Sequence, residues 1–156
     1  TEFFKKAKAE GVHTNLDTSG NPFTDQEPWH SGWLELMKYT DLVMLDIKQI
    51  DEQEHIKLTG HSNKNILAMA RELSDMKKPV WIRHVLVPGG SDKDEYLHQL
   101  ADFIQTLRNV ERVEVLPYHT LGTFKWEKLG IPYPLEGVKP PTQERIDNAR
   151  RILNAI

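Results

Sequence analysis

The sequence predicts an α/β fold in which parallel strands alternate with helices. Apolar residues recur at helical spacings of three and four, and these stretches alternate with short apolar or β-branched runs that end in charged or turn-forming residues. The run 41–48 is apolar and bounded by charges, which is typical of a buried parallel strand. Repeated alternation of this kind favours a sheet with right-handed crossovers, either doubly wound or part of a barrel.

The first elements are a helix, a strand and a second helix. Residues 1–10 carry phenylalanines and alanines at helical spacing, and Gly11 is a helix stop. The β-branched run 12–18 predicts a strand, which the turn formers at 19–22 end. A tryptophan and leucine stripe then predicts a helix over 29–39.

The middle of the chain repeats the pattern. After the strand 41–48, residues 51–58 predict a short helix. Ser62 or Asn63 can cap a longer helix, which stops before a Lys-Pro pair because the residue before proline disfavours helical geometry. The run 80–87 predicts the third strand.

The last part contains one more strand between two helices. Ser91 and the acidic residues after it suit a helix N-terminus, and that helix is expected to reach about Leu107. Residues 113–116 predict the fourth strand, and 117–141 form a segment long enough to favour a functional loop. Thr142 caps the closing helix.

Composition excludes several classes of protein. The 156 residues include no cysteine, so the chain can hold no disulfide, zinc ribbon or thiol nucleophile, and no iron–sulfur cluster through its own thiolates. A formal charge of −3 gives no basic surface for nucleic acid or anionic lipid. No apolar run approaches the length of a membrane span. The chain begins without Met or a signal peptide, as a fragment of a longer protein would.

Ionisable residues stand near the carboxyl end of every predicted strand. They are Asp17, Asp46 and Lys48, the adjacent pair Arg83 and His84, and His119. Because the carboxyl ends of parallel strands carry the chemistry in both candidate folds, these residues are the candidate site. Each also has a purely structural interpretation: Asp17 as a turn former, Asp46 with Lys48 as a self-satisfied ion pair. The other histidines are interpreted as surface or core residues: His30, His55, His61 and His98.

Five sequence runs resemble one protein family. They are the residues 11–20, 40–48, 80–89, 116–122 and 137–141. In order and spacing they closely resemble the pyruvate formate-lyase activating enzymes, which are glycyl-radical-enzyme activases of the radical S-adenosylmethionine superfamily. The resemblance covers essentially the whole chain.

This resemblance implies a fold and an activity. The family fold is a six-stranded partial (β/α) barrel, of which residues 1–156 would supply the last four parallel strands, in the order 1-2-3-4, with helices on the outer face only. The two strands expected before Thr1 would carry the Cys-x-x-x-Cys-x-x-Cys loop and the Gly-Gly-Glu motif. The family is cytoplasmic and uses S-adenosylmethionine, a [4Fe-4S] cluster and reduced flavodoxin or ferredoxin to generate a glycyl radical on pyruvate formate-lyase. Without cysteine, we expect the chain by itself to be inactive.

The resemblance also implies roles for residues that would contact the cosubstrate. Asp46 and Lys48 match a strand-end run that contacts its ribose and carboxylate, and Ile47 between them would offer its backbone. His119 resembles a histidine beside the adenosine. Arg83 would be a further polar contact.

A second implied site holds a monovalent cation. Asp17 with Asp46 resembles a carboxylate pair that binds this cation, and Thr18 and Met44 would add backbone carbonyls. Physical chemistry supports a pairing of this kind, since two anions at neighbouring strand ends repel unless a cation or proton intervenes.

Two alternatives to this function remain. The chain could belong to an activase of another glycyl radical enzyme, such as an anaerobic ribonucleotide reductase or a diol dehydratase. It could also be a non-catalytic half barrel that binds a nucleoside or an anion at the same strand ends. In the partial barrel the strand at 12–18 would pair with the absent second strand, so we expect an open edge there that another copy, a crystal neighbour or a displaced local segment caps.

Overall fold

The structure is a computed structural model that describes residues 1–155, and within them a four-stranded sheet is combined with seven helices. The strands are β1 (Asn15–Thr18), β2 (Leu42–Asp46), β3 (Val80–Leu86) and β4 (Val110–Pro117). The helices are α1 (Glu2–Ala9), α2 (Trp29–Lys38), α3 (Glu52–Thr59), α4 (Lys64–Asp75), α5 (Asp94–Gln105), α6 (Thr123–Leu129) and α7 (Gln143–Leu153). No helix among the described residues is long and apolar enough to cross a membrane.

All strands of the sheet are parallel and follow the order β1-β2-β3-β4, as predicted. The register places Asp17 opposite Met44 and Asp46 opposite Arg83, so side chains from β1, β2 and β3 meet on one face. Within residues 1–155, β1 lies at an open edge of the sheet. The expected cap on that edge, by another copy, a crystal neighbour or a displaced local segment, stays a prediction.

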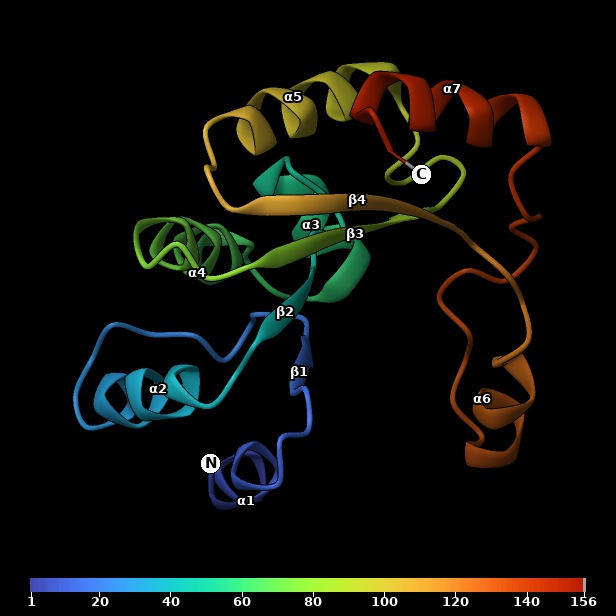
Figure 1. Ribbon diagram of the computed structural model, residues 1–156. Helices are drawn as coiled ribbons and strands as arrows, with labels where there is room; N and C mark the ends of the chain where they lie inside the picture. The colour runs from blue at the N-terminus through green and yellow to red at the C-terminus, as the bar shows by residue number, and fades with distance from the viewer. Residues whose placement is uncertain (156) are drawn as a thin grey trace.

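The two faces of the sheet differ in what covers them. Figure 1 shows α2, α4, α5 and α7 following one another around the outside of the curved sheet, while α6 lies beyond the end of β4. Val43, Leu45 and Ile82 are fully buried in the core that these helices form, whereas Asp46 and Arg83 on the other face are only half-buried. Since helices cover one face, the sheet is part of a barrel, which confirms the predicted fold class.

Several boundaries differ from the sequence prediction. β1 begins at Asn15 rather than at residue 12, and β4 begins at Val110 rather than at residue 113. The segment 117–141, expected to be a loop, contains α6, which ends at Gly130 in left-handed geometry (φ 65°). At the start of α5 the N-cap is Lys93.

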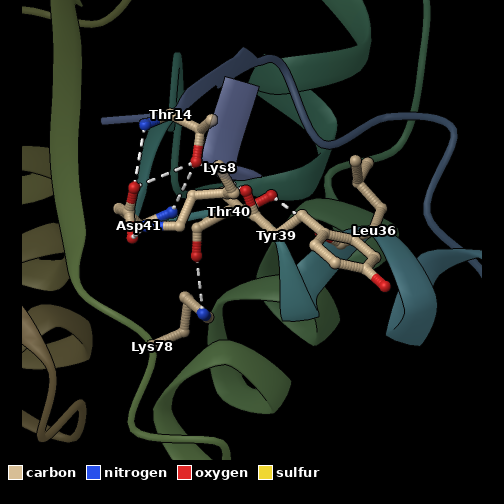
Figure 2. Close-up of polar contacts among 7 residues, drawn as sticks. All are labelled: Lys8, Thr14, Leu36, Tyr39, Thr40, Asp41 and Lys78. Carbon is tan, nitrogen blue, oxygen red and sulfur yellow. Dashed lines mark hydrogen bonds and ion pairs between the residues drawn. The ribbon is translucent and has the colours of Figure 1, made fainter. Parts of the chain in front are cut away.

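A polar cluster ties the amino-terminal ends of β1 and β2 together (Figure 2). The Asp41 carboxylate accepts hydrogen bonds from the Thr14 backbone N–H at 2.8 Å and from the Lys8 ammonium at 2.7 Å. The Thr14 hydroxyl donates to the Tyr39 carbonyl. These bonds, first among them the one from Lys8, lower the pKa of Asp41 from its ordinary value of 3.8 to about 2. The cluster lies at the opposite end of the strands from the candidate site, and we assign it to stability.

Candidate functional site

The predicted site residues of the first three strands form one polar cluster at the carboxyl ends of the strands. Asp17 comes from β1, Asp46 and Lys48 from β2 and the residues just after it, and Arg83 from β3. Because side chains alternate along a strand, the apolar neighbours of these residues face the helices while the four ionisable groups face the open side. We call these four residues the strand-end cluster.

Arg83 is the centre of the strand-end cluster. Its Nε donates to Asp46 Oδ1 at 2.9 Å, and its Nη2 donates to Asp17 Oδ1. Burial of the guanidinium opposes its charge, but the hydrogen bonds and charges of Asp17 and Asp46 outweigh this effect and raise the pKa of Arg83. The guanidinium therefore stays charged and holds two neighbouring strand ends to a third.

Lys48 completes the charge balance of the cluster. Its ammonium donates to Asp46 Oδ2 at 2.9 Å, so the expected ion pair between Lys48 and Asp46 is present. Each oxygen of Asp46 thus accepts one charged donor. Two carboxylates face two cations, and the cluster as a whole is electrically balanced.

The structure changes the physical argument for a monovalent cation. The positive group that lies between Asp17 and Asp46 is the Arg83 guanidinium. The Thr18 hydroxyl accepts a bond from the Gly20 backbone N–H, and Met44 is half-buried opposite Asp17. Over residues 1–155 no three histidine, aspartate or glutamate side chains are arranged to hold a metal ion. The bound monovalent cation stays a prediction.

Two of the predicted site residues, His119 and Ile47, do not belong to the strand-end cluster. His119 lies two residues past the end of β4 and is exposed, and no hydrogen bond within the described chain joins it to the cluster. Ile47 is fully buried, and its backbone is engaged on both sides: its N–H donates to the Arg83 carbonyl at 2.9 Å, and its carbonyl accepts from His84 Nδ1 at 2.8 Å.

A buried polar layer lies under the strand ends; its histidine, His84, was among the strand-end residues predicted from the sequence, but its partners were not. Burial lowers the pKa of His84 although the Ile47 and Ser91 carbonyls oppose this effect, and the contact of Nδ1 with the Ile47 carbonyl at 2.8 Å holds the carboxyl end of β2. Gln49 donates to the Gly90 carbonyl at 3.0 Å, and Asn63 donates to the Ile50 carbonyl at 2.7 Å. These contacts hold the segment that carries Asp46 and Lys48. The position of Asn63 at the start of a helix suggested a cap, and nothing in the sequence marked Gln49.

The cluster can bind a ligand that carries both charge signs or hydroxyl groups. Lys48 has N–H groups beyond the one it gives to Asp46, and each carboxylate oxygen has a second lone pair. The strand-end cluster can therefore accept from hydroxyls and donate to a carboxylate without breaking its own ion pairs.

Comparison with known proteins gives closely similar relatives. No protein-family model matches the chain. The chain is 56% identical over 151 residues to the pyruvate formate-lyase-activating enzyme of Streptococcus mutans, a match that covers 97% of the chain and 57% of the relative. It is 56% identical over 153 residues to the enzyme of the same name from Staphylococcus epidermidis, covering 98% of the chain and 61% of the relative.

Solved structures share the fold. A domain of a pyruvate-formate lyase-activating enzyme from Bacteroides vulgatus superposes with a TM-score of 0.77 at 22% identity, over 98% of this chain and 82% of that domain. A radical SAM methyltransferase from Sphaerobacter thermophilus gives a TM-score of 0.64 at 18% identity, over 93% of this chain and 39% of that protein. Coproporphyrinogen III oxidase from Escherichia coli, a radical SAM enzyme, gives 0.59 at 10% identity, over 96% of this chain and 34% of the oxidase.

The curated relatives are longer than the chain, which spans 57–61% of their length. The match nevertheless extends over almost all of the chain itself, and the fold agrees with it. The resemblance seen in the five sequence runs is therefore confirmed: along 97–98% of its length, this chain is homologous to a segment of the pyruvate formate-lyase-activating enzymes.

Proposed function

We propose that the chain is the carboxyl-terminal part of an activase that uses S-adenosylmethionine and a [4Fe-4S] cluster to generate a glycyl radical on pyruvate formate-lyase. The observation that carries this proposal is the 52–56% identity to enzymes of that name over 97–98% of the chain. Strand ends that present a charge-balanced, hydrogen-bonding cluster support it, because they offer a surface for a zwitterionic nucleoside. On this proposal residues 1–156 are one piece of a larger domain, and the two strands and the cluster loop precede Thr1.

In the proposed complex the strand-end cluster holds the cosubstrate. The second lone pairs of Asp46 accept from the ribose hydroxyls, and the free N–H groups of Lys48 donate to the methionyl carboxylate. The backbone of Ile47 keeps the spacing between these two contacts, Arg83 fixes the orientation of the Asp46 carboxylate, and His119 covers the adenosine.

The residues of the chain do not fit the iron–sulfur cluster. The sequence contains no cysteine, and within residues 1–155 no set of side chains replaces the missing thiolates. The cluster ligands must therefore lie outside these residues, and the chain's own part is to bind and orient the cosubstrate. Reduced flavodoxin or ferredoxin as electron donor and a cytoplasmic location belong to the same proposal.

The monovalent cation forms part of the proposal under one condition. Asp17 and Asp46 can share a cation with the carbonyls of Thr18 and Met44 only if the Arg83 guanidinium leaves the space between the two carboxylates. Otherwise two positive charges would occupy the same site, at a cost that grows as the distance between them falls.

A segment exchange tests the proposed function. The matching 151 residues of the Streptococcus mutans relative are replaced by this chain, and the chimera is reconstituted with iron and sulfide without oxygen. Electron paramagnetic resonance then measures the glycyl radical formed on pyruvate formate-lyase. We expect a radical signal from the chimera and a loss of about tenfold or more in cosubstrate affinity after Lys48→Ala, since a charge-assisted contact contributes about 1.5–3 kcal/mol.

The matched control is Lys57→Ala, which removes a lysine from the exposed side of α3. This variant should retain both the radical signal and the cosubstrate affinity. A chimera that binds its iron–sulfur cluster but gives no radical would refute the proposal. Equal cosubstrate affinity in the two lysine variants would remove Lys48 from the site.

A further inference from the structure

The Arg83 guanidinium has carboxylates on both sides of its strand. Towards β2 and β1 it binds Asp46 and Asp17. Towards β4, the register places Glu114 opposite Arg83. Glu114 is on the same face as Arg83, because its neighbours Val113 and Val115 are buried in the core on the helix side. Neighbouring strands lie only about 5 Å apart, so Glu114 is within reach of the same guanidinium.

Glu114 has acceptor capacity that its present contacts leave unused. Its side chain is 21% exposed, and its Oε1 lies 3.0 Å from Arg112 Nε. This contact is an ion pair without a hydrogen bond, because Arg112 Nε has no hydrogen-bond partner among the described residues. The Arg112 guanidinium lies over the Trp81 ring, 4.7 Å from its centroid. A carboxylate can accept several hydrogen bonds, so Glu114 would be stabilised by a further charged donor.

The contact between Arg83 and Asp17 is the most exposed one in the strand-end cluster. The side chain of Asp17 is 56% exposed, whereas those of Asp46 and Arg83 are each 16% exposed. Water solvates Asp17 whether or not the ion pair forms, so its loss costs little. Asp17 is also open to a ligand from solvent. An exchange of Asp17 for Glu114 would therefore replace an exposed ion pair by a half-buried one.

We propose that Glu114 is a second acceptor for Arg83, which turns from Asp17 to Glu114 when a monovalent cation binds between Asp17 and Asp46. The cation carries the same single charge as the guanidinium it replaces, so the two aspartates stay balanced and Arg83 stays paired. Glu114 is thus a positioning residue that acts through Arg83. The inference rests on the proposed function, which includes a cation at these strand ends.

Nuclear magnetic resonance of the 156-residue chain, labelled with ¹⁵N, tests the proposal. Potassium chloride is titrated while ¹H–¹⁵N correlations follow Arg83 Nε, assigned by its loss in Arg83→Lys, and the backbone amide of Thr18. Choline chloride at the same ionic strength is the matched probe, because a quaternary ammonium is too bulky to enter between two carboxylates. We expect a saturable shift of both signals with potassium and none with choline.

Variants of the carboxylates sharpen the test. In Glu114→Gln the guanidinium loses its second charged acceptor, so the affinity for potassium should fall about tenfold. Glu111→Gln removes an exposed carboxylate from the same strand and should bind potassium as the unaltered chain does. In Asp17→Asn the guanidinium should turn to Glu114 without any cation, which moves its Nε signal towards the position reached with potassium.

Removal of Arg83 separates positioning from a direct effect of the Glu114 charge. Arg83→Gln should bind potassium more tightly than the unaltered chain, since no guanidinium competes for the site. Adding Glu114→Gln to Arg83→Gln should change the affinity no further. An effect of Glu114 that acts on the cation through space would persist in this background.

Three results would overturn the proposal. They are equal potassium affinity in Glu114→Gln and Glu111→Gln, an equal loss from Glu114→Gln with and without Arg83, and the absence of any saturable response to potassium. A radical signal from the chimera beside any of these results would leave the proposed function intact. A chimera without a radical, beside the expected response of Arg83 and Glu114→Gln, would refute the proposed function alone.

Discussion

Replacing Asp41 by Asn should destabilise the fold by an amount that depends on pH. In the ionised form Asp41 accepts from the Lys8 ammonium and from the Thr14 backbone N–H, and these bonds are the largest causes that hold its pKa at about 2 instead of 3.8 (Figure 2). At about 1.36 kcal/mol per pKa unit, this difference corresponds to an upper bound of about 2.4 kcal/mol. Because the side chains of Asp41 and Lys8 are 28% and 37% exposed, water screens the pair, and we expect about 1–1.5 kcal/mol.

The direction of the pH dependence follows from linkage. The folded chain binds the Asp41 proton more weakly than the unfolded chain does, so the ionised carboxylate contributes its full stabilisation above about pH 4. This contribution is lost as the pH falls from about 4 to about 2. In Asp41→Asn the carboxylate is absent, so the difference between the two proteins should shrink over this window.

Urea unfolding followed by circular dichroism, at pH 7 and in steps down to pH 2, measures both effects. Asp102→Asn, which removes an exposed carboxylate from α5, is the control and should change the free energy of unfolding by less than about 0.5 kcal/mol. If Asp41→Asn is as stable as the unaltered chain at pH 7, or if the difference persists unchanged at pH 2, the assignment of this cluster to stability is wrong.

Three further predictions concern the core, the strand-end cluster and the missing thiolates. Gly20 has a φ of 69°, and a Cβ there would lie 2.9 Å from Leu45 Cδ1, so Gly20→Ala should lower the free energy of unfolding in urea by about 2–3 kcal/mol. Gly130 has a φ of 65° but open space around it, so Gly130→Ala should lower the free energy of unfolding by only about 1 kcal/mol, and equal losses in the two variants would contradict the close approach at Gly20. Arg83→Met should lower the free energy of unfolding by about 2 kcal/mol because Asp46 loses a charged donor, and Arg83→Lys should restore only part of that loss. If Arg83→Met is as stable as the unaltered chain, the ion pair between Arg83 and Asp46 does not stabilise the fold. After anaerobic reconstitution with iron and sulfide, the isolated chain should release no 5′-deoxyadenosine or methionine from S-adenosylmethionine, and release above a protein-free control would contradict this expectation.

The sequence alone determined the type of sheet and the face that carries the site. Buried strands such as β2 are marked by a local apolar run, and the side-chain period of two assigns Asp46 and Lys48 to the face opposite Leu45. These signals are local, so they survive without knowledge of the remaining chain. The choice between a barrel and a doubly wound sheet came from the five family-like runs, since both folds produce the same alternation.

Element ends were less predictable because pairing and turn geometry decide them. β4 begins at Val110 because it pairs there with Val80, a partner that lies 30 residues earlier in the sequence. α6 was missed, although Gly130 directly after Leu129 is a helix-stop signal that could have indicated it.

The internal arrangement of the site was decided only by the tertiary structure. The sequence required some positive charge between Asp17 and Asp46, and the register of three strands made Arg83 that charge. In the same way the sequence does not show the partner of the buried His55, whose Nδ1 lies 2.6 Å from the His61 carbonyl oxygen in the turn after α3. Strand register and side-chain partners both depend on contacts between segments that are distant in the sequence or joined by a turn, and local residue patterns carry no information about them.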